Sequence, residues 1–148
     1  MRKAVITVVA LALAAALAAG GLAAVGKEGT YKLSAKLTAA REVPKPTGVP
    51  AGAEGTFTGT LRGKKLTFRL TFARLSGKAL AAHIHKRKAG TSGPVLITLC
   101  GPCKSPVTKT VTVTSAQRNV IEHKATYVNV HTAKNQGGEI RGQIKATE

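Results

Sequence analysis

The stretch TFTGTLRGKKLTFRLTFA, residues 56–73, contains two strand-like segments joined by a short turn. Residues 56–61 and residues 65–73 are rich in threonine and apolar side chains, which favour extended backbone. In the second segment the apolar side chains fall on every second residue, at Leu66, Phe68, Leu70 and Phe72, so they share one face of a strand. We predict a hairpin whose apolar face lies in the core.

Short strand-like segments continue in both directions from this hairpin. Tyr31, Leu33, Ala35 and Leu37 alternate with polar residues, and a loop rich in proline and glycine follows at 42–55. Further strand-length runs occupy residues 78–86, 93–100, 105–114, 125–132 and 139–146. The capping-box pattern T-x-x-Q at 114–117 predicts one short helix near 115–122. Seven or eight short strands predict an all-β fold, a β-sandwich with Greek-key connections.

The N-terminal segment differs from the rest of the chain. Arg2 and Lys3 precede a run without charge from Ala4 to Gly26, and small residues crowd its end. This pattern is typical of a secretory signal peptide, which we predict at residues 1–26 as a hydrophobic helix. The run is also long enough to remain as an uncleaved membrane anchor. The domain is then residues 27–148, and we expect it outside the cytoplasm, either secreted or in the cell envelope or periplasm.

The charge of the chain is strongly positive. It carries 23 lysines and arginines against 6 acidic residues, for a net charge of +17, and the sequence contains no aspartate. Such a charge attracts anions, so an anionic cell-envelope polymer or an extracellular protein is the expected partner. The tightest basic cluster, Lys86, Arg87 and Lys88, is the candidate anion-binding site. Aromatic residues are few, which argues against a dedicated nucleic-acid function. Membrane contact is expected only if the N-terminal helix is retained.

The two cysteines, Cys100 and Cys103, form the sequence CGPC. In a redox-active motif the first cysteine begins a helix, which lowers the pKa of its thiol. Here the following residues, KSPVTKTVTVT, are β-branched and interrupted by Pro106. For an exported protein we therefore predict a structural disulfide in a small loop rather than a redox centre.

Three histidines lie on segments predicted as strands. Strand alternation puts His83 and His85 on one face, with Leu80, Ala82 and Ile84 on the opposite, core-facing side. His131 shares a face with two residues of its own strand and with alternate residues of the last strand. We predict that these form a polar cluster: Tyr127, Asn129, Glu139, Arg141 and Gln143. Converging imidazoles suit copper or zinc, so His83, His85 and His131 are the candidate metal ligands. The alternative is a polar strand face without a metal.

Three blocks of the sequence resemble the CHRD domain, named for chordin. They are REVPKPTGVPAGAEGTFTGTL (41–61), AAHIHKRKAGTSGPVLITL (81–99) and YVNVHTAKNQGGEIRGQI (127–144), in the expected order. The resemblance implies an immunoglobulin-like or superoxide-dismutase-like β-sandwich, and it implies no assigned activity. By distant similarity to copper/zinc superoxide dismutase, His83, His85 and His131 would map onto copper ligands and Arg141 onto an anion-guiding arginine. The chain has no candidate for a histidine that bridges two metals, and it lacks the aspartate of a zinc site.

Three functions follow, in order of preference. The first is a non-enzymatic extracellular binding or structural module of unknown ligand. The second is a copper- or zinc-binding domain, and the third is a dismutase-like redox enzyme. The sequence presents neither a serine–histidine–carboxylate arrangement nor paired carboxylates, so we expect no catalytic activity.

Overall fold

The computed structural model describes residues 29–148, and the predicted signal peptide lies outside these residues. Within them, the elements are β1 (Thr30–Thr38), the short 3-10 helix η1 (Ala39–Arg41), β2 (Glu54–Arg62), β3 (Lys65–Ala73), β4 (Ala79–Lys86), β5 (Val95–Cys100), β6 (Val107–Thr112), α1 (Ser115–His123), β7 (Thr126–Thr132), β8 (Ile140–Gln143) and β9 (Lys145–Thr147). The domain is all-β with one short α-helix, as predicted. None of the helices in residues 29–148 has the length and apolar character needed to cross a membrane.

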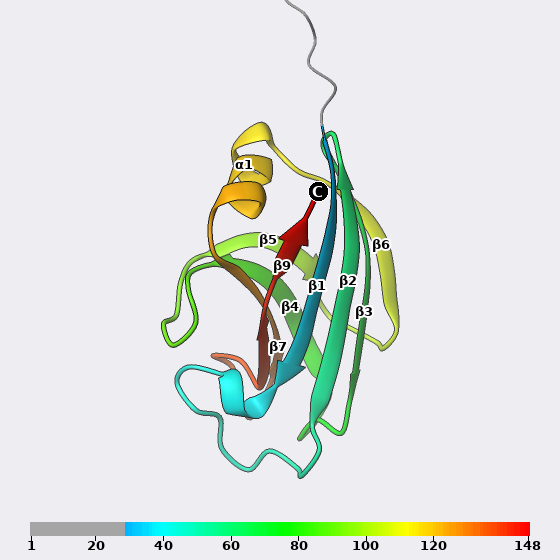
Figure 1. The fold of residues 1–148 in the computed structure, drawn as a ribbon. Coiled ribbons are helices and arrows are strands. Elements are labelled where there is room, and N and C mark those ends of the chain that lie inside the picture. The colour runs from blue at the N-terminus through cyan, green and yellow to red at the C-terminus, as the bar shows by residue number, and fades with distance from the viewer. Residues whose placement is uncertain (1–28) are drawn as a thin grey trace, which may run out of the picture.

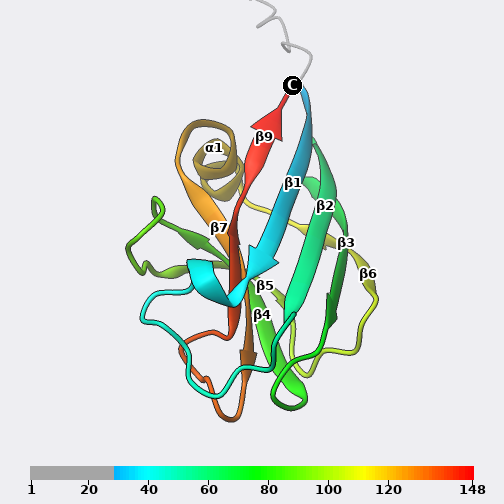
Figure 2. The same cartoon turned by 60° about the horizontal axis from the view of Figure 1, so that its bottom comes forward.

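The strands form one antiparallel sheet that folds over into two layers (Figures 1 and 2). The strand order is β5-β4-β7-β8-β1-β2-β3-β6, with β9 paired to β1. One layer holds β4, β5, β7 and β8, and the other holds β1, β2, β3 and β6. The pair Thr38–Arg141 joins β1 to β8 between the layers. Because β7 returns beside β4 after β5 and β6, the connection is of Greek-key type, which confirms the predicted class.

The hairpin of residues 56–73 is β2 and β3, which pair along their whole length. The turn between them places Gly63 at a φ of 53°, a conformation that glycine adopts at little steric cost. Phe57 and Phe68 stack in the core with their ring centroids 5.8 Å apart. Leu66 and Leu70 are fully buried beside them. Leu66, Phe68 and Leu70 of the predicted stripe therefore lie in the core, and Phe72, near the end of β3, is partly buried against it.

Helix α1 lies at one end of the sandwich, near the start of β1 and the C-terminus (Figure 1). Its capping box forms as predicted: Thr114 Oγ1 accepts from the Gln117 backbone N–H, and Gln117 Oε1 accepts from the Thr114 N–H. The Arg118 guanidinium donates to the carbonyls of Gly63 and Gly29, at 2.7 and 2.8 Å. These bonds attach the helix to the β2–β3 turn and to the start of β1.

The prediction for Leu80 is wrong. Strand alternation placed it on the core face with Ala82 and Ile84, which are fully buried, but the Leu80 side chain is 48% exposed. The register between β4 and β7 shifts between Ala79 and Ala81, so Ala79 is buried in its place. A bulge of this kind reverses the alternation of the residues before it.

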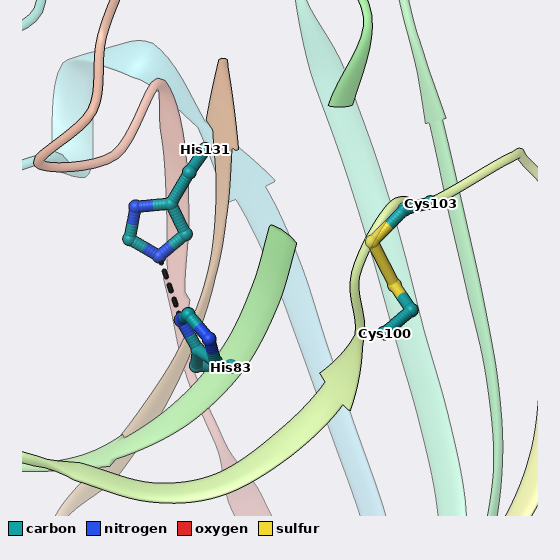
Figure 3. Close-up of a disulfide and its surroundings, with 4 residues drawn as sticks. All are labelled: His83, Cys100, Cys103 and His131. Atoms are coloured by element: carbon teal, nitrogen blue, oxygen red, sulfur yellow. Dashed lines mark hydrogen bonds between the residues drawn. A yellow bond between two sulfur atoms is a disulfide. The ribbon is translucent and has the colours of Figure 1, made fainter. Parts of the chain in front are cut away.

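Cys100 and Cys103 form a disulfide at the end of β5, with their Cα atoms 5.4 Å apart (Figure 3). The Cys103 backbone N–H donates to the Ala79 carbonyl at 3.0 Å, which attaches the loop to the start of β4. The next regular element is strand β6, so neither cysteine begins a helix. This environment is that of a structural crosslink.

Candidate metal centre

The histidines of β4 and β7 meet on the outward side of their layer. These strands are neighbours, and their register pairs Ala81 with His131 and His83 with Asn129. One nitrogen atom from each of His83, His85 and His131 can be chosen so that all three lie within 4.8 Å of one another. His83 Nδ1 and His131 Nε2 are 3.0 Å apart and point toward one another (Figure 3). Two adjacent strands therefore bring the three predicted ligands together.

Backbone carbonyls fix the tautomers of two of these rings. His85 Nδ1 lies 2.8 Å from the Gly93 carbonyl oxygen, and His131 Nδ1 lies 2.8 Å from that of Gln136. Because a carbonyl only accepts, both Nδ1 atoms carry the proton, and each Nε2 presents a lone pair in the neutral ring. The Nε2 of His85 is buried and has no hydrogen-bond partner. Histidine ligands of metals are commonly held in this way by a bond from the other ring nitrogen.

The surroundings keep the imidazoles neutral. Burial, together with the neighbouring His131 and His85, lowers the pKa of His83 to about 4. Burial also lowers the pKa of His85 and of His131, against the opposing effect of their carbonyl bonds. Neutral imidazole is the form that binds a metal, so the three rings are ready to coordinate at neutral pH.

A stack of three side chains supports one side of the cluster. Tyr127 lies parallel to His85, with ring centroids 4.9 Å apart. The Arg141 guanidinium carbon is 3.4 Å from the centroid of the Tyr127 ring. The guanidinium also donates to the carbonyls of Lys88 and Thr91 at 3.1 and 2.9 Å. These bonds hold the 87–94 loop over the buried His85.

Two further members of the predicted polar cluster are Gln143 and Asn129. Gln143 Oε1 accepts from the Arg141 guanidinium at 3.1 Å, and Gln143 Nε2 donates to the Arg87 carbonyl at 3.1 Å. Asn129, opposite His83 on β7, is buried and donates weakly to the Gly137 carbonyl at 3.4 Å. Tyr127, Asn129 and Arg141 thus lie beside His85, and Gln143 bonds to Arg141.

Glu139 lies in a different environment from the one that alternation predicts. It precedes β8, and its buried carboxylate accepts bonds from Ser76, Thr132 and Asn135, with distances from 2.5 to 3.0 Å. Burial alone would raise the pKa of Glu139, but these hydrogen bonds lower it overall. The carboxylate therefore links Ser76, Thr132 and Asn135 by hydrogen bonds. It is not among the groups that converge with the imidazoles.

Glu42 is a buried carboxylate of this region that the sequence did not indicate. It lies at the end of η1, is 2% exposed, and accepts from the Val43 backbone N–H at 3.0 Å. Burial raises the pKa of Glu42, with Arg141 and Asn129 acting in the opposite direction. Gly138, at a φ of 129°, allows this packing, since a Cβ there would lie 2.3 Å from Glu42 Oε2. A loop residue without periodic neighbours gives no sequence signal of such burial.

The predicted anion-binding residues Lys86, Arg87 and Lys88 lie at the end of β4 and in the loop after it. All three are exposed. They border an open hollow of about 440 Å³ together with Ser92 and Lys124. The backbone carbonyls of Arg87 and Lys88 accept the bonds from Gln143 and Arg141, so the basic loop is attached to the polar cluster.

Comparison with known proteins gives one match. Residues 33–144 match the CHRD domain, and this range includes the three histidines, both cysteines and the polar cluster. No curated protein and no solved structure matches the chain.

Proposed function

The chain belongs to the CHRD domain family, and we propose that it is a non-enzymatic binding module that holds one copper or zinc ion through His83, His85 and His131. The observation that carries this proposal is the convergence of three imidazole nitrogens within 4.8 Å. The family match supports a binding role. The ligand set is supported by the side chains themselves.

The geometry is close to what a metal requires. Two nitrogens bound to one tetrahedral zinc ion at about 2.0–2.1 Å lie about 3.3 Å apart. His83 Nδ1 and His131 Nε2 are 3.0 Å apart, and all three nitrogens lie within 4.8 Å of one another. Binding of one ion would therefore require the rings to shift and the proton on His83 Nδ1, which His131 Nε2 accepts, to move to Nε2 of the His83 ring. His85 is already oriented by the Gly93 carbonyl and by Tyr127. Three protein ligands would leave a fourth position for water or for an external ligand.

The donor set favours borderline metals. The converging group contains three neutral nitrogens and neither a thiolate nor a carboxylate among the described residues. Imidazole donors suit copper and zinc, and affinity for divalent ions generally rises to Cu²⁺ and falls again at Zn²⁺. We therefore expect Cu²⁺ to bind more tightly than Zn²⁺. The Cys100–Cys103 disulfide agrees with a site outside the cytoplasm, where such crosslinks persist.

Titration calorimetry of protein without a histidine tag tests the proposal. We expect one Cu²⁺ and, more weakly, one Zn²⁺ per chain. His83→Ala/His85→Ala should lose at least a hundredfold in affinity. His123→Ala is the matched control, because His123 is exposed at the end of α1 and outside the cluster. Equal binding by both variants would show that the three imidazoles are not the site. The metal-loaded protein should turn over superoxide no faster than the free ion.

A further inference from the structure

The outward face of the β1-β2-β3-β6 layer combines cations with hydroxyl groups. Its outward positions alternate with the core residues of the same strands, and the side chains there are exposed or partly exposed. We call it the basic face and define it by its cations: Lys32, Lys36, Arg62, Lys65, Arg69 and Lys145. Glu54 is the acidic residue of these strands, and Arg74 pairs with it at 3.1 Å.

The strand register places a hydroxyl group beside each group of cations. Lys32 lies opposite Thr60 and donates to its Oγ1 at 3.1 Å. Arg69 lies between Thr58 on one side and Thr108 on the other. Along the strands the same pattern recurs every second residue, which is about 6.8 Å. From β9 to β6 the face crosses five strands, or about 19 Å.

Two open hollows lie on this face. One, of about 690 Å³, is bordered by Lys36, Thr56, Thr71 and Lys145, among others, and by Glu54, whose charge is paired with Arg74. The other, of about 450 Å³, is bordered by Lys32, Thr58, Thr67 and Arg69, among others. Both therefore offer ammonium or guanidinium groups and hydroxyls to the same ligand.

We propose that the basic face binds an acidic polysaccharide, a hydroxyl-rich chain that carries carboxylate or sulfate groups. The cations match the charges of such a chain, and the threonine hydroxyls can donate to and accept from its sugar hydroxyls. The proposal is independent of the metal site, which belongs to the other layer.

The same face is poorly suited to other anionic partners. Phe57 and Phe68 of its strands point into the core, so the face has no aromatic platform for nucleic-acid bases. The large apolar side chains that are exposed in residues 29–148, Leu80 and Val95, belong to β4 and β5 of the other layer. The basic face therefore has no apolar anchor of the kind that inserts into a lipid surface or fills a pocket of a protein partner.

Binding of polygalacturonate, which carries carboxylates, and of heparin, which carries sulfates, tests the proposal on the purified protein. The face variant is Arg62→Gln/Lys65→Gln/Arg69→Gln. The matched control, Lys78→Gln/Lys104→Gln/Lys134→Gln, removes the same number of charges from exposed lysines that lie outside the basic face and outside the Lys86, Arg87 and Lys88 cluster. We expect the face variant to bind at least one of the two polysaccharides tenfold or more weakly, and the control to change by less than twofold. The face variant should also reduce the dependence of log K on log salt by about two.

Thr56→Val/Thr58→Val removes hydroxyls without changing charge and keeps β-branched side chains. We expect it to weaken polysaccharide binding about threefold and to leave the weaker binding of polyglutamate, an anionic chain without sugars, unchanged. Equal losses in the face and control triple variants would overturn the proposal in favour of a diffuse charge effect. Binding to polyglutamate as tight as to the polysaccharides, or binding confined to anionic phosphatidylglycerol vesicles, would overturn it too. Thermal melting checks that each variant is folded.

Discussion

Tyr127 lies between His85 and Arg141 and contacts both. Its ring is nearly parallel to the imidazole, at 7°, and the guanidinium carbon is 3.4 Å from its centroid. Strand β7 lies between β4 and β8, so the two partners approach the ring from opposite sides. The Tyr127 hydroxyl also accepts from the Gly93 N–H at 3.2 Å, and the Gly93 carbonyl accepts from His85. Tyr127 thus positions the candidate ligand His85 in two ways: its ring stacks on the imidazole, and its hydroxyl binds Gly93, whose carbonyl accepts from His85.

Tyr127→Leu removes this support and leaves all three histidines in place. We expect Cu²⁺ affinity to fall about tenfold, as when other groups that orient metal ligands are removed. Tyr127→Phe keeps the stacked ring and loses only the hydroxyl, so its affinity should stay within about threefold of the parent. Competition with a chelator of known affinity measures both. A Tyr127→Leu protein with unchanged affinity would show that the stack does not orient His85.

The metal-free protein should become less stable as the pH falls from about 6.5 toward 4. The pKa of His83 is lowered to about 4 in the folded chain and is ordinary in the unfolded chain, so the unfolded state binds more protons in this interval. Unfolding is therefore favoured progressively as the pH falls through it. Thermal unfolding from pH 7.5 to 4 measures the effect, and His83→Gln should show a shallower fall in Tm. Parallel curves for the two proteins would argue against the lowered pKa.

Gly138→Ala should destabilise the fold by about 1–3 kcal/mol. The residue has a φ of 129°, and a Cβ would lie 2.3 Å from Glu42 Oε2, so the change adds backbone strain to a buried overlap. Gly137→Ala is the control, because a Cβ there meets nothing within 4 Å. Urea unfolding measures the free energy of unfolding of both variants. A loss in Gly137→Ala as large as in Gly138→Ala would assign the effect to loop flexibility instead.

Glu139→Gln should cost about 2–3 kcal/mol in the free energy of unfolding. The carboxylate accepts from Ser76, Thr132 and Asn135, and an amide would turn an NH₂ group toward some of these donors. Glu54→Gln makes the same chemical change in an exposed ion pair with Arg74 and should cost less than about 1 kcal/mol. Chemical denaturation compares the two. Similar small costs would mean that the buried network contributes little.

Alternation along each strand was sufficient to predict the fold class, the core stripe of β3 and the outward side of His83, His85 and His131. These features depend on residues two apart, and the period of a strand is two. The capping box predicted the start of α1 for a similar local reason. The prediction for Leu80 was wrong because a bulge inserts one residue into the strand. A sequence that alternates on both sides of a bulge does not show where the bulge lies.

The contacts between strands could not be predicted in the same way. The distance between His83 and His131 depends on the register of β4 against β7, and the sequence does not reveal this register for two residues that are 48 positions apart. Glu139 directly precedes β8 and lies outside the strand, so strand alternation does not fix the direction of its side chain. Glu42 is buried by loops, whose conformation depends on Gly138 at a distant point in the sequence.

The two layers of the sandwich turn their outer faces in opposite directions. A chain that lies with its basic face on a cell-wall or matrix polymer would therefore present His83 and His131 to the surrounding solution. With the proposed ion bound, the domain would exchange it with the medium without leaving the polymer. Immobilised on such a polymer, many copies would form a fixed layer of metal-exchanging groups.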